Sequence, residues 1–213
     1  MTGLVLKDFL MMRKTLKTYL IFFALYLGMA IAGIFPISIV TSMVTVIIAI
    51  LPISTFVYDD AAKWDRYAVS LPLGRRKVVG ARYLFIALLL LVSAAFGLLT
   101  IVLAPLMGQG ELTELAATVL VTITYGLALN DIVIPLVYKL GAERARMYLY
   151  IIIFAPVILL FLAVRLGLLD LSGLSAISEG TVLLVCSLMP VAGVAGLGLS
   201  YVISCRIYEK KEF

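Results

Sequence analysis

The chain has 213 residues, of which 64% are hydrophobic and 14% charged, with 17 Lys and Arg against 12 Asp and Glu. Because a soluble globular domain is about half apolar and about a quarter charged, this composition excludes an ordinary soluble protein. The absence of histidine removes the commonest general base and zinc ligand, so we expect no metal site and no catalysis. The net charge of +5 does not indicate a nucleic acid partner, because the basic residues follow the pattern of a membrane protein.

The apolar residues occur in blocks long enough to cross a membrane. About 20 helical residues span the hydrocarbon core, so a block of about 18 or more indicates a transmembrane helix. Six such blocks leave only short connectors, and no stretch is long enough for a folded soluble domain of ordinary size. We therefore predict an all-α integral membrane protein with one domain, residues 1–213. Its six spans lie at about residues 18–34, 38–58, 80–106, 114–138, 147–167 and 181–204.

The segment before the first span, residues 4–20, has an amphipathic pattern. Its larger apolar residues lie broadly to one side and its basic residues elsewhere; the apolar set is Leu6, Phe9, Leu10 and Leu16. Basic amphipathic segments of this kind usually lie in the plane of the lipid headgroups. We predict a short interfacial helix here, with contact to a cytoplasmic partner as the alternative.

The N-terminal region also resembles a signal peptide in outline. A basic start is followed by an apolar stretch and by Ala30-Ile31-Ala32, which is similar to a cleavage site. Charge does not decide between the two, because a cleaved signal peptide enters the membrane in the same orientation. We favour a retained helix, since the apolar stretch is long for a signal peptide and the next span follows directly after Phe35-Pro36.

The orientation of the spans follows from the basic residues. Sixteen of the 17 Lys and Arg fall in the N-terminal segment, the second and fourth connectors and the C-terminal tail; only Arg165 falls on the other side. Basic residues are concentrated in cytoplasmic loops. We therefore expect a multi-pass protein of the cell membrane with both termini in the cytoplasm. The external connectors are too short to capture a soluble substrate.

The connector between spans two and three, residues 58–84, is the most patterned segment. Asp59 and Asp60 are good capping residues for a helix that follows them. Apolar residues then recur at spacings of three and four, which predicts a short amphipathic helix. This stripe consists of Ala61, Trp64, Tyr67, Ala68 and Leu71, with Lys63, Asp65 and Arg66 on the other face.

A turn at residues 71–74, Leu-Pro-Leu-Gly, ends this short helix, and Arg75 begins the helix that continues into span three. Two interpretations of the short helix stay open on physical grounds. It rests on the lipid headgroups with Trp64 and Tyr67 as aromatic anchors, or it is a rigid element presented to a cytoplasmic partner.

Two runs of this sequence resemble the type-2 ABC transporter permeases, in particular a small branch with six helices and no large external domain. The first is KWDRYAVSLPLGRRKVVGARYL, residues 63–84, in which an aromatic-acidic-basic helix leads into Ser-Leu-Pro and a basic cluster. The second is PLVYKLGAERAR, residues 135–146, at the inner end of span four. The branch includes permease subunits that export amphipathic peptides such as phenol-soluble modulins.

The resemblance implies a half-transporter that pairs with a second copy or a similar chain and couples to a separate ATP-hydrolysing subunit, which holds ATP and Mg. It implies that the connector helix docks on that subunit. The residues involved would be Asp60, Lys63, Trp64, Asp65, Arg66, Tyr67 and Leu71, and a second cytoplasmic contact would use Lys139, Glu143, Arg144 and Arg146.

The ATP-hydrolysing site is not in this chain. The sequence contains no Gly-Lys dipeptide, so the phosphate-binding loop G-x-x-x-x-G-K-[ST] is missing and no cofactor of its own is expected. The resemblance and the apolar spans favour a hydrophobic or amphipathic peptide as cargo, with a lipid or a drug next. An immunity-type permease and an ATP-independent structural subunit or carrier are the alternatives.

Polar residues within the predicted spans are few. Asn130-Asp131 is the only strongly polar pair, and an ionisable residue in a span is a functional candidate. Because Asp131 lies about 27 Å from the outer end of its span, we expect it near the inner interface. We favour a structural role over substrate contact, either pairing with Lys139 or Arg144 or capping a helix break before Pro135.

A stripe of small residues occurs in the last span. Ala192, Gly196, Ser200 and Ser204 recur every four residues, a spacing that places them on one helix face. Small residues on such a face let two helices approach closely. The sequence leaves open whether this face packs inside the chain or between two copies.

Overall fold

The structure, a computed structural model, describes residues 2–70, 74–106, 108, 111–167 and 179–211. Within this part the chain forms seven α-helices and no strand. The helices are α1 (Thr2–Ile31), α2 (Ile37–Ala61), α3 (Trp64–Ser70), α4 (Arg75–Leu106), α5 (Leu112–Leu140), α6 (Ala142–Arg165) and α7 (Glu179–Lys210). All except α3 are long and apolar enough to cross a membrane, which confirms the prediction of six spanning helices.

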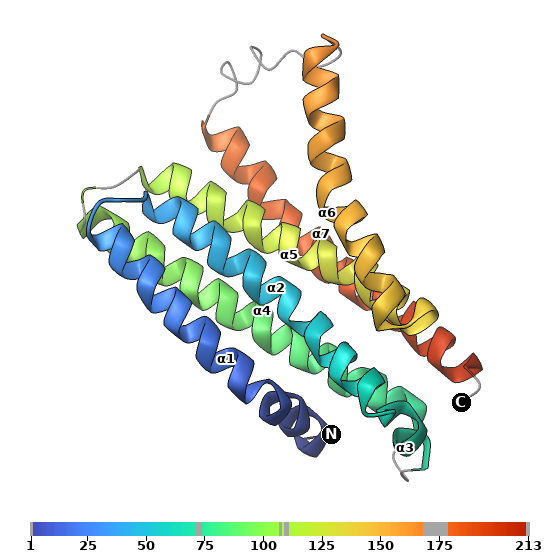
Figure 1. Ribbon diagram of the computed structural model, residues 1–213. Helices are drawn as coiled ribbons and strands as arrows, with labels where there is room; N and C mark the ends of the chain where they lie inside the picture. Colours follow the sequence, from blue (N-terminus) through green and yellow to red (C-terminus); the bar gives the residue numbers. More distant parts are fainter. Residues whose placement is uncertain (1, 71–73, 107, 109–110, 168–178, 212–213) are drawn as a thin grey trace.

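The long helices other than α6 run roughly alongside one another, with α2 at the centre (Figure 1). The helix α2 packs against α1, α4 and α5, and α7 packs along α5 and α4. In the most apolar stretch of α2, 56% of the residues are buried, against 6% in α1, α6 and α7. A helix that is apolar all round suits such a central place, because it meets neighbouring helices on several sides.

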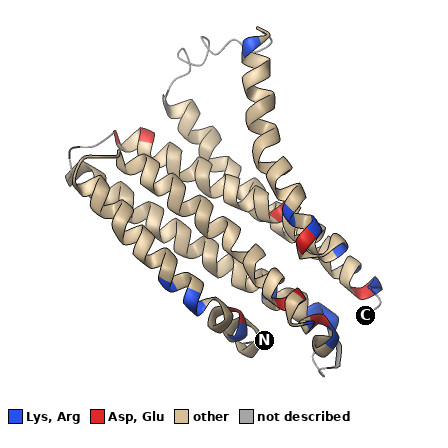
Figure 2. Cartoon of the chain, viewed as in Figure 1, with Lys and Arg blue, Asp and Glu red and all other residues tan. Residues whose placement is uncertain are grey.

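Both ends of the chain lie at the same end of the bundle, next to α3 (Figure 1). Figure 2 shows that the Lys and Arg residues gather toward this end, together with most of the acidic residues. We call it the charged end. The one-sided charge predicted from the sequence is therefore a feature of the folded chain, whereas the cytoplasmic location of this end stays a prediction.

The start of α1 differs from the expectation of a separate interfacial helix. The chain is helical without interruption over Thr2–Ile31. The buried residues of its first turns are Val5, Asp8 and Met12, which share one face at spacings of three and four. Of the predicted apolar face, Phe9 and Leu16 pack against the core, whereas Leu6 and Leu10 are each 59% exposed, so the prediction is confirmed for half of the face. Asp8, which was not part of that face, is buried and pairs with α4, as described below.

The link between α5 and α6 is a single residue, Gly141. Its φ of 84° lies in the left-handed region that glycine adopts at little cost, and its N–H donates to the carbonyl of Val137 at 2.8 Å. The helix α5 runs unbroken through Pro135, so the helix break that we expected before this proline is not present. In α6 only Ala142, Ala145 and Leu149 are buried, and Figure 1 shows α6 leaving the bundle beyond its first turns.

Candidate functional site

A network of buried charges lies at the charged end, where α1, α2 and α4 meet. Arg82 of α4 is at its centre, with Nη1 3.0 Å from Oδ2 of Asp8 and Nη2 in contact with Oδ2 of Asp59. The Arg82 side chain is only 7% exposed, and those of Asp8 and Asp59 are 4% and 6% exposed. Nη1 also donates to the hydroxyl of Thr55 at 2.6 Å.

Lys7 completes this network, which we call the Arg82 cluster (Lys7, Asp8, Thr55, Asp59 and Arg82). Its Nζ lies 2.8 Å from Oδ1 of Asp59 and 3.2 Å from Oδ1 of Asp8. Two cations therefore balance two carboxylates, as burial of charge requires. The planar guanidinium presents two different nitrogens to the two carboxylates, in a fixed geometry that an ammonium group lacks. The cluster ties the first turns of the chain to α2 and α4.

The Arg82 cluster was not predicted. Asp8 is a single acidic residue among the basic residues of the N-terminal segment, and that contrast was the available signal. Asp59 was predicted to cap the helix that follows it, but it lies inside α2 and faces Arg82. The prediction for Asp59 is therefore wrong, because α2 continues to Ala61 and the carboxylate finds a cation on α4.

Asp60 is a capping residue, although of a different helix than predicted. Its Oδ2 accepts a hydrogen bond of 2.8 Å from the N–H of Ala142, the first residue of α6. The N–H groups of a first helical turn have no partner within the helix, so a carboxylate stabilises them. Asp60 thus joins the end of α2 to the start of α6, 82 residues away along the chain.

We expect Asp60→Ala to destabilise the protein by about 0.5–2 kcal/mol, the usual cost of removing a helix cap. Asp60→Asn should cost less, because an amide oxygen can also accept this hydrogen bond. The measurement is the thermal midpoint of the purified protein in detergent. An equal loss for both variants would contradict a capping role.

Two side chains of α3 turn toward the bundle. The ring centroid of Trp64 lies 4.1 Å from Nζ of Lys7, a cation–π contact with α1. The carboxylate of Asp65 accepts hydrogen bonds of 3.3 Å each from the hydroxyl of Tyr208 and from Nζ of Lys211, at the end of α7. Trp64 and Asp65 were predicted to contact a partner subunit, and in the folded chain they contact α1 and α7.

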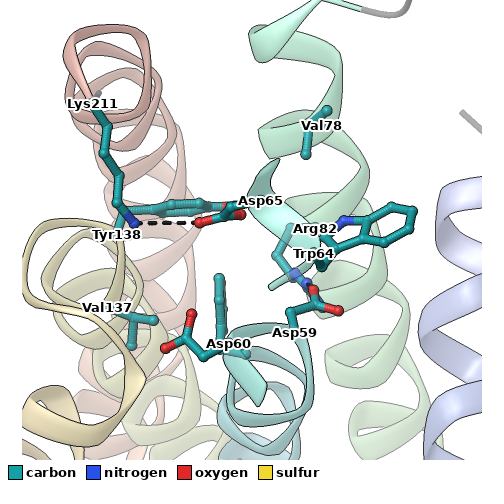
Figure 3. A pocket seen from close by; sticks show the side chains of 10 residues that line it. Asp59, Asp60, Trp64, Asp65, Val78, Arg82, Val137, Tyr138 and Lys211 are labelled. Atoms are coloured by element: carbon teal, nitrogen blue, oxygen red, sulfur yellow. Dashed lines mark hydrogen bonds and ion pairs between the residues drawn. The ribbon is translucent and has the colours of Figure 1, made fainter. Parts of the chain in front are cut away.

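A small cavity lies between these groups (Figure 3). Its lining is mixed: five charged residues, Asp59, Asp60, Asp65, Arg82 and Lys211, and five apolar or aromatic ones, Phe56, Trp64, Val78, Val137 and Tyr138. Its volume of about 20 Å³ is enough for roughly one water molecule. The inner side of α3 therefore faces a small cavity with charged and apolar walls.

The outer side of α3 is open. Arg66 is exposed and the Tyr67 side chain is 59% exposed, whereas Ala68 is buried. Lys63, also exposed, lies in the turn between α2 and α3 with a φ of 50°. The structure thus divides the predicted docking residues into an inward pair and an outward group, and Leu71 lies outside the described residues.

The residues of the second predicted contact lie together at one corner of the fold. Lys139, Glu143, Arg144 and Arg146 are all exposed at the corner where α5 meets α6. An open cleft of about 600 Å³ lies between the end of α2 and this corner, and it is lined by Val57, Asp60, Ala61, Leu140, Gly141, Ala142, Glu143 and Arg144. The connector and the α5–α6 corner, 80 residues apart along the chain, therefore share one surface at the charged end.

Asn130 and Asp131 lie away from this surface, between helices. The amide of Asn130 donates to the carbonyls of Ala49 and Gly126, at 3.1 and 2.8 Å. The backbone carbonyl of Asp131 accepts a 2.8 Å hydrogen bond from Ser200 of α7. No ion pair in the described part of the chain involves Asp131, so the predicted pairing with a nearby cation is not observed.

Three of the four residues in the small-residue stripe of the last span pack inside the chain, and Ala192 is exposed. Gly196 faces the carboxylate of Asp131 so closely that an added Cβ would lie 2.3 Å from Oδ2. The hydroxyls of Ser200 and Ser204 form hydrogen bonds of 2.7 and 2.8 Å with that of Tyr83 on α4. Gly196, Ser200 and Ser204 therefore contact α5 and α4, so this part of the stripe serves packing within the chain.

These features define a multi-spanning α-helical membrane protein whose buried and exposed charges gather at one end. The family model of the ABC-2 family transporter protein matches residues 3–209. The chain therefore belongs to the ABC-2 transporter family and is a membrane component of a transport system. No curated protein and no solved structure matches the chain.

Proposed function

We propose that this chain is the permease subunit of an ABC exporter, which moves a hydrophobic or amphipathic peptide out of the cell with ATP hydrolysed by a separate subunit. The observation that carries this proposal is the family match over residues 3–209, together with the open outer side of α3. A membrane component without a phosphate-binding loop needs a partner that supplies the energy. ATP and Mg belong to that partner.

The partner subunit docks on two parts of this chain: the outer side of α3, and the cleft between the end of α2 and the α5–α6 corner. Arg66 and Tyr67 offer a cation and an aromatic ring, two residue types that are enriched where interfaces gain most of their energy. Glu143 and Arg144 line the far side of the cleft and offer charges of both signs. Lys139 and Arg146 lie exposed at the same corner and complete the second contact.

The chemistry of the spanning helices supports an apolar or amphipathic cargo. The exposed surfaces of α6 and α7 consist mainly of large aliphatic and aromatic side chains. Few polar groups in the spans could replace the hydration shell of a sugar or an ion. Two permease subunits, both with their termini in the cytoplasm, would enclose the pathway, and the cargo would be a peptide that already partitions into the membrane.

We expect Arg66→Glu and Tyr67→Ala to remove an ATP-hydrolysing subunit that co-purifies with the detergent-solubilised chain. Truncating or reversing a residue at the centre of an interface costs about 2 kcal/mol or more, which is more than a tenfold loss of affinity. Co-purification and peptide-stimulated ATP hydrolysis measure this effect. The matched controls are Arg13→Glu, at an exposed position of α1, and Tyr67→Phe, which keeps the ring.

The outcomes separate the possible roles. Loss of the partner in the two α3 variants, with retention in both controls, supports the proposal. If the unaltered chain binds no ATPase, the exporter function is wrong. If it binds one whose hydrolysis rises with lipid but not with an amphipathic peptide, the cargo is wrong. A peptide of the same composition with a scrambled, non-amphipathic order is the control for cargo.

A further inference from the structure

We propose that the two ends of the chain hold α3 in position, through Lys7 on one side and through Tyr208 and Lys211 on the other. We call this arrangement the α3 clamp (Lys7, Trp64, Asp65, Tyr208 and Lys211). In this inference, which rests on the proposed function, these contacts set the orientation of the docking helix. Lys7 and Lys211 are positioning residues that act through α3.

The length of α3 is the first reason. It has seven residues, about two turns, and helices much shorter than about 12 residues are not stable on their own. The position of such a helix must therefore come from contacts with other elements. Ala68 supplies a small buried contact, and the polar contacts of Trp64 and Asp65 supply the directional ones.

The second reason is that the same cation serves two elements. Lys7 contacts Asp59 of α2 at 2.8 Å and the Trp64 ring at 4.1 Å. The ion pairs of Lys7 with Asp8 and Asp59 fix the position of its ammonium group. The Trp64 ring therefore contacts a cation that other residues already hold in place. A movement of α1 relative to α2 would change both contacts together.

The other side of α3 is held by α7 in a similar way. Asp65 accepts hydrogen bonds from Tyr208 and Lys211, and Tyr208 is almost completely buried. Arg75, which begins α4, donates to the carbonyls of Tyr208, Glu209 and Lys211. The last carbonyls of a helix have no partner within it, so this arginine ties the end of α7 to the start of α4.

The small cavity behind α3 is the third reason. Trp64 and Asp65 border it from α3, and Lys211 borders it from the C-terminal end of the chain (Figure 3). The cavity is lined by apolar as well as charged side chains and has room for roughly one water molecule, so the packing behind α3 is incomplete. The polar contacts of α3 therefore contribute to its position. They connect it to α1 and α7, both of which are long enough to cross the membrane.

Trp64 is the only tryptophan of the chain, so its fluorescence reports on α3 alone. We expect Lys7→Gln and Lys211→Gln to make Trp64 more accessible to acrylamide, measured on the full-length protein in detergent without any partner. Lys14→Gln and Lys210→Gln are the matched controls, because both remove an exposed cation from the same helices. Lys7→Arg, which keeps a cation at this position, should leave the accessibility of Trp64 as low as in the unaltered protein. Equal quenching in Lys7→Gln and Lys14→Gln would overturn the clamp.

The second measurement uses the assembled complex. Asp65→Lys and Lys211→Asp should each lower the ratio of peptide-stimulated to unstimulated ATP hydrolysis, and the double variant should restore it, because the ion pair is rebuilt in reverse. Tyr208→Phe is the mildest variant, since it removes one hydrogen bond to Asp65 and keeps the ring. Tyr208→Phe should lower the same hydrolysis ratio while the yield of purified protein stays unchanged.

The two measurements fail in different ways. If the unaltered chain binds no ATPase, the proposed function is wrong, and the quenching experiment still tests the clamp. Quenching could rise in the Lys7 and Lys211 variants while Tyr208→Phe and both single charge reversals leave the ratio of peptide-stimulated to unstimulated ATP hydrolysis unchanged. In that case the clamp holds α3 but does not affect coupling, and the inference is overturned. Restored hydrolysis in the double reversal supports it.

Discussion

Arg82→Met should lower the free energy of unfolding by about 3–5 kcal/mol, the usual cost of removing one partner from a buried ion pair. The substitution leaves two nearly fully buried carboxylates, Asp8 and Asp59, with Lys7 as their only cation within the Arg82 cluster. The measurements are the yield of monodisperse protein in detergent and its thermal midpoint. Arg82→Lys should fall between, because an ammonium group keeps the charge but lacks the separate, fixed N–H groups that a guanidinium presents to two carboxylates.

The matched control for this prediction is Arg13→Met, since Arg13 is exposed on α1 and makes no ion pair in the described part of the chain. A charge-balanced variant separates the loss of the pair from the loss of packing. Combining Arg82→Met with Asp8→Asn and Asp59→Asn should recover much of the stability, because no buried carboxylate is then left unpaired. Equal midpoints for Arg82→Met and Arg13→Met would show that the cluster contributes nothing.

The six spanning helices were predictable because the bilayer sets their length. An apolar block of about 20 residues has few structural alternatives in a membrane, so hydropathy alone finds it. The boundaries were less predictable. Two of the helices have 32 residues, about 48 Å, and extend beyond the hydrocarbon core, so polar residues such as Arg75 and Lys210 belong to helices that also span.

The site was predictable only in part, because its contacts join residues far apart in the chain. The sequence pattern found α3 and the α5–α6 corner, since both are local. It did not find that Asp8 pairs with Arg82, or that Asp60 caps a helix 82 residues away. An acidic residue near a helix end suggests a local cap, and only the packing of distant helices shows which N–H or cation it meets.

The faces of α1 and α3 illustrate the same limit. From hydrophobic periodicity alone, the apolar side of an amphipathic helix is expected to face the interior. In α1 the packed side includes the ion-paired Asp8 along with Phe9, and Leu6 is left exposed. In α3 the predicted stripe divides, with Ala68 buried and Tyr67 exposed, because the neighbouring helix ends offer polar partners to Trp64 and Asp65.

Gly196→Ala should destabilise the protein by about 1–3 kcal/mol, the range for overpacking a close helix contact. An added Cβ would lie 2.3 Å from Oδ2 and 3.1 Å from Cγ of Asp131, so either the carboxylate or α7 must move. The thermal midpoint in detergent measures this cost. Gly198→Ala is the matched control on the same helix, because nothing lies within 4 Å of a Cβ at that position.

Asp131→Ala together with Gly196→Ala should recover most of the lost stability, because the two substitutions share one contact. The prediction reaches beyond packing, since the same helix carries Tyr208 and is followed directly by Lys211, and both residues donate hydrogen bonds to Asp65. If Gly196→Ala displaces α7 rather than the carboxylate, Trp64 should also become more accessible to acrylamide. If the midpoint of Gly196→Ala equals that of Gly198→Ala, the close approach of α5 and α7 at Gly196 does not contribute to stability.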